Sequence, residues 1–382
     1  MRKKAKSKSR GGTRRTWVEV DTSALTENAR TMKKILSGKG LMAVVKSNAY
    51  GHGMVRSAKA FLEGGAEYLA VDDLDEALTL RREGIRAPIL VLGYIVPERI
   101  KEAVTRGISI TISSTSALEE LTHIRFSKKP RIHLKFETGL HRQGIPESDA
   151  DQVLSAITSR SFSGIIEGVY THFATMESPE NEGYSRRQAK RFDAFVSMLR
   201  ERGFHPLRHV SASSGILFSP DFHYDVARAG IALYGLWPSP EIHTVARNVT
   251  LVPALSWKSI VSEVKHVVRG ERVGYDLTYT LSRDSRLAVM PVGYWHGLPR
   301  SLSNTGMVII HGRYVPIVGR ISMDMTILDV TDVPSVCAGD VVTIIGKDGD
   351  AVLGADTVAE KAGTINYEIV TRINPLIDRI EL

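Results

Sequence analysis

The sequence has one cysteine, no long hydrophobic run and, at its start, no acidic residue. The lone cysteine, Cys337, excludes an intrachain disulfide and a cysteine-based zinc site. Scarce cysteine is typical of a reducing compartment, so we expect a cytoplasmic protein without a metal centre. The longest apolar run, at 89–96, is interrupted by Gly93 and is far shorter than the roughly 20 residues of a membrane helix. We therefore expect a soluble protein with no membrane contact.

The first 15 residues contain eight lysines and arginines and no acid. Removing these eight from the 50 basic residues leaves 42 against 42 acidic ones, so this segment carries the whole net charge of +8. No apolar stretch follows the charges, so we do not expect a secretory signal. Two interpretations stay open: a disordered solubilising tail or mis-assigned start over 1–16, and an arm that contacts nucleic acid. We adopt the first and expect no nucleic-acid partner.

The length of 382 residues favours two domains. Between residues 40 and 235, short apolar runs typical of strands alternate with amphipathic stretches typical of helices. The predicted strands lie at 41–45, 68–71, 89–92, 108–112, 132–136, 165–169, 209–211 and 226–234, and the clearest helices at 54–63, 74–83, 98–106 and 184–202. Eight such units predict a parallel (β/α)₈ barrel. A doubly wound open sheet is the alternative, but no glycine fingerprint follows the first strand.

After residue 250 the pattern changes to β-rich segments separated by Gly, Asp and Pro, with little helical pattern before 355–362. This sequence pattern predicts a separate, mainly-β domain. We place the barrel at 17–245 and the β domain at 246–382. The strand WVEVD, at 17–21, precedes the barrel, and we expect it to join the β domain.

A lysine stands directly after the first predicted barrel strand, in AVVKSNAYGHG at 43–53. In a (β/α)₈ barrel the carboxyl ends of the strands carry the active site. A lysine in apolar surroundings is costly unless it is paired, neutralised or modified, and a desolvated amine is suited to forming a Schiff base. An isolated lysine at a strand end usually extends to solvent instead, so the role of Lys46 depends on the motifs around it.

The stretch at 43–53 resembles the pyridoxal-phosphate lysine motif of the alanine racemases. Eight further segments resemble motifs of that family in the same order: HLKFETGLHRQG (133–144), YTHFATME (170–177), HVSASSG (209–215), ARAGIALYGL (227–236), VGYDLTYT (273–280), PVGYWHGLPR (291–300), GRISMDM (319–325) and GTINYE (363–368). The resemblance extends from about residue 17 to the C-terminus. It implies an N-terminal (β/α)₈ barrel with a C-terminal β domain, in agreement with the pattern-based prediction. It also implies an isomerase that interconverts L- and D-alanine with pyridoxal 5'-phosphate and supplies D-alanine for peptidoglycan.

The resemblance further implies a two-base mechanism. Lys46 would hold the cofactor covalently and act as the base on one face of the substrate α-carbon. Tyr275, in VGYDLTYT, would act on the opposite face and would come from the second subunit of a homodimer with shared active sites. A phenol has an unperturbed pKa near 10, and the family lowers it through the histidine that matches His172.

Other matching residues imply contacts with the cofactor. Its phosphate would be bound by Tyr50, Ser213, Tyr367 and the backbone of Gly230 and Ile231. Hydroxyls and backbone N–H groups are good ligands of a dianion. Arg228 would face the pyridine nitrogen. Because arginine stays protonated, it donates to that nitrogen without protonating it, which makes the ring a weaker electron sink and favours racemisation over transamination.

The substrate contacts follow from the same resemblance. Arg142 would steady the substrate carboxylate and the phenolic oxygen of the cofactor, the backbone of Met323 would meet the carboxylate, and Tyr294 would line the entrance. Lys135 matches a lysine that is carbamylated in many relatives, and an ordinary ion pair with Glu137 or another acid is the alternative.

Three positions depart from the family's pattern: Ala212 replaces a frequent asparagine, Ser322 a cysteine and His296 an aspartate. They leave open whether the enzyme is selective for alanine or also acts on serine, lysine or arginine. Two other rivals remain. A non-catalytic cofactor-binding barrel would lack the β domain, and a decarboxylase of similar two-domain plan is disfavoured by Arg228.

Overall fold

The structure is a computed structural model that describes residues 13–159 and 164–382. Most of the basic tail, residues 1–12, lies outside the described residues. The chain divides into two compact units. The barrel unit comprises Ser23–Ala49 and Gly53–Pro253, and the β unit comprises residues 13–22, Tyr50–His52 and Ala254–Leu382.

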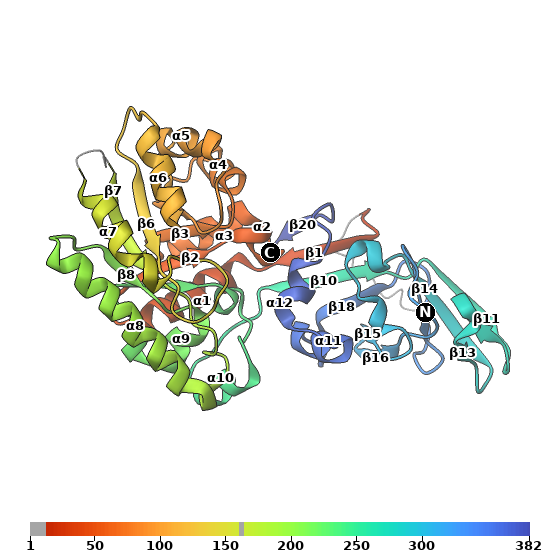
Figure 1. The fold of residues 1–382 in the computed structure, drawn as a ribbon. Coiled ribbons are helices and arrows are strands. Elements are labelled where there is room, and N and C mark those ends of the chain that lie inside the picture. Colours follow the sequence, from red (N-terminus) through yellow and green to blue (C-terminus); the bar gives the residue numbers. More distant parts are fainter. Residues whose placement is uncertain (1–12, 160–163) are drawn as a thin grey trace. The chain divides into compact units, whose positions relative to one another are not determined.

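Eight parallel strands form the sheet of the barrel unit, in the order β8-β7-β6-β5-β4-β3-β2-β9 (Figure 1). They are β2 (Gly40–Val44), β3 (Tyr68–Val71), β4 (Ile89–Val91), β5 (Ser109–Ile112), β6 (Arg131–Lys135), β7 (Ile165–Tyr170), β8 (Leu207–His209) and β9 (Val226–Ala229). The outermost strands approach each other, because the backbone N–H of Asp225 donates to Arg208 (3.1 Å) and that of Arg228 to Ser211 (3.0 Å). The predicted parallel barrel is confirmed.

Most helices of the barrel unit follow a strand and bury one apolar face. The helices are α1 (Thr22–Ile35), α2 (Lys46–Tyr50), α3 (Met54–Glu63), α4 (Leu74–Arg82), α5 (Pro97–Thr105), α6 (Thr115–His123), α7 (Ala150–Thr158), α8 (Glu182–Glu201), α9 (Ser213–Phe218) and α10 (Pro240–Val245). Of these, α1 precedes the first barrel strand and α2 is a short left-handed turn. The four helices predicted most clearly from their periodicity lie within two residues of α3, α4, α5 and α8. In α8, for example, Phe192, Phe195 and Leu199 are buried on one side, as a 3.6-residue period requires.

Two strand predictions were wrong at their carboxyl ends. The run predicted at 209–211 ends as a strand at His209, and the run predicted at 226–234 ends at Ala229 and continues as a 3-10 helix, η4 (Ile231–Tyr234). The cause is local: the hydroxyl of Ser213 accepts the backbone N–H of Gly230 and of Ala232. Those N–H groups are therefore turned away from strand pairing.

The β unit contains a seven-stranded sheet, in which the path β16-β15-β18-β10-β1-β20 is joined by β19 on β18 (Figure 1). Its strands are β1 (Thr16–Val20), β10 (Leu255–Ile260), β15 (Met307–Ile310), β16 (Arg313–Pro316), β18 (Val341–Asp348), β19 (Ala351–Leu353) and β20 (Arg379–Glu381). The N-terminal strand β1 pairs antiparallel with β10 and parallel with β20. Trp17, Val18 and Val20 on β1 are all at most 1% exposed, so this strand is part of the core of the β unit.

The rest of the β unit consists of small sheets, short helices and turns. The elements are β11 (Glu263–Val267), β14 (Ser285–Met290) and β17 (Thr326–Asp329) in one sheet, β12 (Arg272–Val273) and β13 (Tyr279–Thr280) in another, helices α11 (Ala355–Ala362) and α12 (Asn366–Thr371), and 3-10 turns η5 (Tyr275–Leu277), η6 (Tyr294–His296) and η7 (Arg300–Leu302). The turns η5 and η6 carry two residues that the sequence places at the active site, Tyr275 and Tyr294.

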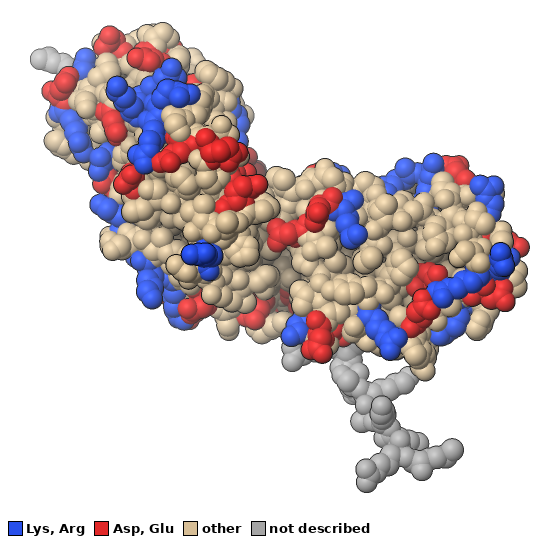
Figure 2. Space-filling model, turned by 90° about the horizontal axis from the view of Figure 1, so that it is seen from below, with Lys and Arg blue, Asp and Glu red and all other residues tan. Residues whose placement is uncertain are grey.

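Both signs of charge occur on the face of each unit shown in Figure 2. This mixture agrees with the balance of 42 basic and 42 acidic residues beyond the tail. Within the described ranges, no helix is both long and apolar enough to cross a membrane.

Two glycines with the same backbone conformation give a matched test of the fold. Gly235 ends η4 with φ +81°, and a Cβ there would lie 1.9 Å from the carbonyl oxygen of Val252; Gly84 also has φ +81° but has open space around it. We expect Gly84→Ala to lower the free energy of unfolding by about 1–2 kcal/mol, from left-handed strain alone. Gly235→Ala should lose about 1–3 kcal/mol more through overpacking. Urea unfolding of both variants measures the difference, and equal losses would contradict the assigned packing.

Candidate functional site

The segment after β2 has an uncommon backbone conformation. Ser47, Asn48, Ala49 and Tyr50 all have φ between 51° and 54°, so four consecutive residues other than glycine are left-handed. Each such residue costs roughly 1–2 kcal/mol, and such strain is found chiefly where function requires it. The turn begins at Lys46, directly at the carboxyl end of the strand.

Two carboxylates on neighbouring segments hold this turn. Glu76 accepts the backbone N–H of Ser47 (2.6 Å) and of Asp72 (2.9 Å), and burial raises the pKa of Glu76. Asp72 in turn lies 3.2 Å from the Lys46 Nζ. The lysine is therefore paired, and its side chain is 38% exposed. Of the possibilities that the sequence left open for Lys46, the structure shows pairing, because Asp72 and Glu76 follow β3, the neighbour of β2.

Arg228 of β9 is the buried centre of the barrel's carboxyl end, with 4% exposure. Its Nη1 donates to Nδ1 and to the carbonyl oxygen of His209, at 2.9 and 2.7 Å. Its Nη2 donates to the carbonyls of Thr171 and Val210, both at 2.8 Å, and to Nδ1 of His172 at 3.2 Å. None of these bonds uses Nε, so its N–H is the donor that remains for a bound group. Desolvation lowers the pKa of Arg228 to about 10, which keeps it protonated near neutral pH.

Contact with Arg228 fixes the state of His172. Burial, followed by the charges of Arg228 and Arg142, lowers the pKa of His172 well below 6.5. The ring is therefore neutral near pH 7. Because arginine only donates, Nδ1 of His172 is the acceptor and its proton lies on Nε2. His172 thus presents an N–H donor on the side away from Arg228.

Lys135, at the end of β6, is 6% exposed and donates to Gln143 Oε1 at 3.0 Å. Burial and then the charges of Arg142 and Arg228 lower its pKa to about 8. Arg142 is exposed, and in the described part of the chain no carboxylate lies within ion-pair distance of it. The predicted alternative of a Lys135–Glu137 ion pair was wrong, since the Glu137 carboxylate instead accepts the N–H groups of the loop that follows it, at 139 and 140.

The predicted phosphate ligands of the barrel unit lie together. Ser213 Oγ accepts the N–H of Gly230 at 2.9 Å and that of Ala232 at 3.3 Å, so Ile231 lies between two N–H groups directed to one hydroxyl. All of these residues are buried. Hydroxyls and backbone N–H groups at such a turn are suited to binding an anion, and the N–H groups of Gly230 and Ala232 are here donated to the Ser213 hydroxyl.

The remaining predicted residues lie in the β unit. The rings of Tyr50 and Tyr367 are 6.2 Å apart, so these two proposed phosphate ligands are neighbours. Tyr294 and Met323 also lie together, because the backbone N–H of Tyr294 donates to residue 322 and that of residue 295 to Met323. Tyr275 is 68% exposed on its turn. The structure therefore groups the predicted residues by unit.

His296 shows how one departure from the family's pattern is accommodated. Its Nδ1 accepts the backbone N–H of Gly293 at 3.2 Å, and the ring is 4% exposed. A carboxylate at this position would accept the same N–H group. Asp324 lies 3.9 Å from the ring. The histidine thus closes the loop that carries Tyr294.

Sequence reasoning missed the residues beneath Arg228. His133 and His209 occur in quoted motifs, yet they received no role, and neither did Tyr170 or Glu167. The signal was present in β6, where the polar residues Arg131, His133 and Lys135 alternate with apolar ones. A period of two places them on one face of the strand, which in a barrel can be the interior.

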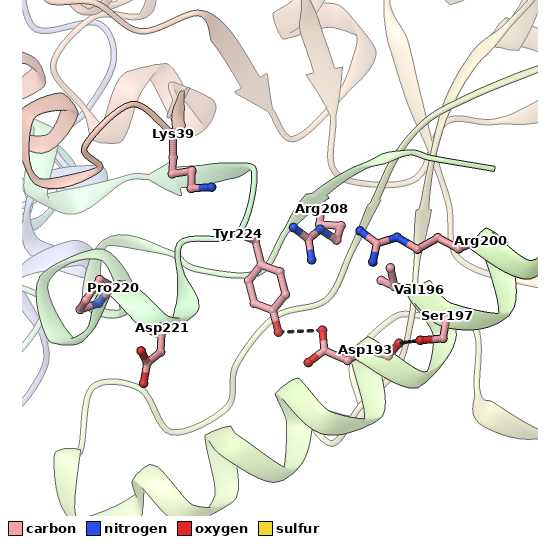
Figure 3. A pocket seen from close by; sticks show the side chains of 9 residues that line it. All are labelled: Lys39, Asp193, Val196, Ser197, Arg200, Arg208, Pro220, Asp221 and Tyr224. Atoms are coloured by element: carbon pink, nitrogen blue, oxygen red, sulfur yellow. Dashed lines mark hydrogen bonds between the residues drawn. The ribbon is translucent and has the colours of Figure 1, made fainter. Parts of the chain in front are cut away.

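A cavity of about 450 Å³ lies elsewhere in the barrel unit (Figure 3). Its lining includes Lys39, Arg208 and Tyr224, which lie at the amino ends of strands. Tyr224 donates to Asp193 (3.0 Å), as Figure 3 shows, and Arg208 is paired with Asp225. Active sites of such barrels lie at the opposite, carboxyl ends, so this cavity is not the candidate site.

Lys46, Arg228 and Ser213 thus lie at the carboxyl end of one parallel barrel, and the chain also forms a separate β unit. The model of the alanine racemase N-terminal domain matches residues 20–238, and that of the alanine racemase C-terminal domain matches 254–381. The chain belongs to the alanine racemase family and is therefore an isomerase.

Relatives with that name resemble the chain over nearly its whole length. The alanine racemase of Symbiobacterium thermophilum is 41% identical over 96% of this chain and 97% of its own. That of Methanococcus maripaludis is 40% identical over 96% and 98%. The crystal structure of alanine racemase from Bacillus anthracis with bound L-Ala-P superposes with a TM-score of 0.90, at 39% identity over 97% of this chain and 95% of that one.

Two histidines that desolvation keeps neutral predict a pH dependence of stability. Burial holds the pKa of His172 and of His209 well below 6.5 in the folded protein, whereas unfolded histidines titrate near 6.5. As pH falls below about 6.5 the unfolded chain takes up protons that the folded one does not, so stability falls. Each histidine contributes about 1.4 kcal/mol per pH unit in that range. We expect His172→Gln to reduce the slope of the free energy of unfolding against pH, between pH 6 and 5, by the amount that one proton contributes. Urea unfolding at several pH values measures this slope. An unchanged slope would contradict the assignment.

Proposed function

We propose that this protein is a pyridoxal-phosphate-dependent alanine racemase that uses Lys46 and Tyr275 as its two bases. The observation that carries the proposal is the placement of Lys46, Arg228 and Ser213 at the carboxyl end of one barrel. The direct test is the formation of D-alanine from L-alanine, and of L-alanine from D-alanine, by the purified protein supplied with pyridoxal phosphate. A protein that binds the cofactor and leaves both enantiomers unchanged would contradict it.

The chemistry of these residues fits an anionic pyridoxal cofactor. Lys46, Lys135, Arg142 and Arg228 bring four cationic side chains to this end of the barrel. Burial, followed by repulsion from Arg142 and Arg228, lowers the pKa of Lys135 to about 8. A bound dianion would relieve that repulsion. Ser213 and the backbone of Gly230 and Ile231 would bind its phosphate, and on the β unit the hydroxyls of Tyr50 and Tyr367, whose rings are neighbours, would be two more ligands.

When bound, the cofactor would supply an electron sink for the negative charge left on the substrate α-carbon. Arg228 would limit that sink, because its Nε–H would donate to the pyridine nitrogen while the guanidinium keeps its proton. Lys46 would hold the cofactor through its amine and, once released by alanine, move a proton on one face of the α-carbon. Arg142 and the backbone of Met323 would orient the substrate carboxylate, and Tyr294 would line the entrance.

Tyr275 would move the proton on the opposite face. A phenol needs its pKa lowered to serve as a base at neutral pH. His172 would provide this help, since its Nε2–H is directed away from Arg228 and can donate to a phenolate. The two bases exchange roles with the direction of reaction.

A homodimer would bring Tyr275 to the site. The β unit exposes several large apolar residues on segments near this tyrosine, namely Leu277, Trp295, Met323 and Met325, all at least 48% exposed. Surfaces of this kind are typical of protein–protein contacts. In a two-fold dimer the surface that donates a residue also receives one, so two shared active sites would form.

Mixed dimers test this sharing. We expect Lys46→Ala and Tyr275→Phe homodimers each to lose about 10²–10⁴-fold in kcat. Refolding them together in equal amounts should restore about a quarter of wild-type activity, because half of the dimers contain one site with both bases. No recovery on mixing, with heterodimer demonstrated by a tag on one chain, would contradict a base supplied by the partner.

We also propose that Lys135 is carbamylated. With a pKa of about 8, about a quarter of the amine is neutral at pH 7.5 and can attack CO₂, which forms the carbamate and releases one proton. The resulting anion would pair with Arg142. We expect a carbamate carbon signal in ¹³C NMR of protein equilibrated with ¹³C-bicarbonate, lost in Lys135→Gln and kept in Lys39→Gln. A signal that persists in Lys135→Gln would contradict the assignment.

We place the enzyme in the cytoplasm, where D-alanine would be made for peptidoglycan, with alanine as the preferred substrate. One methylene in a pocket changes binding by only about 1–3 kcal/mol, so selectivity must be measured. Racemisation rates on alanine, serine, lysine and arginine decide it, and equal rates on lysine and alanine would contradict alanine preference. Deletion of residues 1–12 should leave the rates unchanged.

A further inference from the structure

A chain of hydrogen bonds runs from Arg228 through the interior of the barrel. Nη1 of Arg228 lies 2.9 Å from Nδ1 of His209. Nε2 of His209 lies 2.8 Å from Nδ1 of His133. Nε2 of His133 lies 3.3 Å from a carboxylate oxygen of Glu167. His209 and His133 are 0% and 3% exposed, so their ring nitrogens have these neighbours in place of water.

The residues at its two ends fix the direction of donation along this series of hydrogen bonds. Arg228 only donates, so Nδ1 of His209 accepts and the proton of its neutral ring lies on Nε2. That N–H donates to Nδ1 of His133, whose own proton then lies on Nε2 and is donated to Glu167. A carboxylate only accepts. Donor and acceptor therefore match at every step, and the opposite tautomers would place two donors together at Arg228.

Glu167 is fixed as the terminal acceptor by two further donors. Ser109 donates from its hydroxyl to the oxygen that faces His133, and Arg131 is paired with the other oxygen at 2.8 Å. These contacts, with His133, lower the pKa of Glu167 against the effect of its burial. Glu167 is thus held ionised at the end of the chain.

The backbone of β7 is shaped to admit this arrangement. Register between β6 and β7 shifts at His133, which pairs with Gly168. A Cβ on Gly168 would lie 2.2 Å from Nδ1 of His133, so only glycine leaves room for the ring. On its other side, His209 stacks on the ring of Tyr170, at 4.7 Å between centroids and an angle of 12°.

We propose that Glu167 is a positioning residue for the reaction: through His133 and His209 it fixes an acceptor against Nη1 of Arg228 and so leaves Nε–H directed to the bound ligand. The proposal rests on the proposed function, in which that ligand is the pyridine nitrogen. Two histidine rings lie between Glu167 and Arg228, so Glu167 would act without touching the substrate or the cofactor. It acts by fixing the proton of His133 and that of His209 on their Nε2 atoms.

Neutron diffraction from a deuterated crystal of the holoenzyme tests the chain directly. We expect one deuteron on Nε2 of both His133 and His209, none on their Nδ1 atoms, and none on Glu167. A deuteron on Nδ1 of either ring, or a protonated Glu167, would overturn the proposal. The positions of these deuterons do not depend on racemisation, so a failure of the proposed function and a failure of this inference give different results.

Glu167→Gln tests the consequence for catalysis. The amide oxygen of the glutamine should accept from the charged Arg131, so its NH₂ group should face Nε2 of His133. Two donors would then meet at Nε2. The His133 ring should therefore carry its proton on Nδ1 instead. We expect kcat to fall about tenfold, the scale seen for outer partners of functional histidines, with KM for alanine nearly unchanged. Wild-type kcat in a variant whose His133 deuteron has moved to Nδ1 would also overturn the proposal.

A matched control changes an acid to its amide at the amino end of the barrel. The Asp193 carboxylate accepts the hydroxyl proton of Tyr224. It makes no hydrogen bond to the series of described residues that leads from Arg228 to Glu167. We expect Asp193→Asn to keep wild-type kcat and to leave both deuterons on Nε2. An equal loss of kcat in both variants would assign the effect of Glu167→Gln to general destabilisation and contradict a positioning role.

Discussion

The buried guanidinium of Arg228 is the interaction on which the rest of the site depends. A fully desolvated cation is costly unless every donor has an acceptor, and here carbonyls at the ends of two strands and two histidine rings supply them. Each acceptor is thereby fixed in turn. His172 is held neutral with its proton on Nε2, His209 likewise, and Nε of Arg228 alone remains for a ligand. One charge in the interior thus sets the protonation of its neighbours.

Electrostatics also relate the site to its proposed cofactor. Four cationic side chains lie at the carboxyl end of the barrel, and burial, followed by repulsion from Arg142 and Arg228, lowers the pKa of Lys135. Such a site is stabilised by an anion, whether a bound phosphate, a substrate carboxylate or a carbamate on Lys135. The strained turn after Lys46 is consistent with the same function, because four left-handed residues place that amine at the strand end.

Much of this architecture could be predicted from the sequence. Periodicity was sufficient for the parallel barrel, for four helices within two residues and for a β-rich second half, because burial of one face imposes its period on the residues. Features that depend on contacts distant in sequence could not be predicted. The pairing of Lys46 with Asp72 requires β2 and β3 to be neighbours, and the redirection of Gly230 by Ser213 shortened the predicted last strand. The chain from Arg228 to Glu167 joins four strands, and only the alternation of polar residues on β6 indicated it.

The proposed function requires Lys46 to be the residue that holds the cofactor. Reduction of the holoenzyme with borohydride would make that attachment permanent, and peptide mapping would then locate it. We expect the visible absorbance band to be lost and a single pyridoxyl label to be found on Lys46. A label on Lys135 or any other lysine, or no label in a protein that has bound the cofactor, would contradict it.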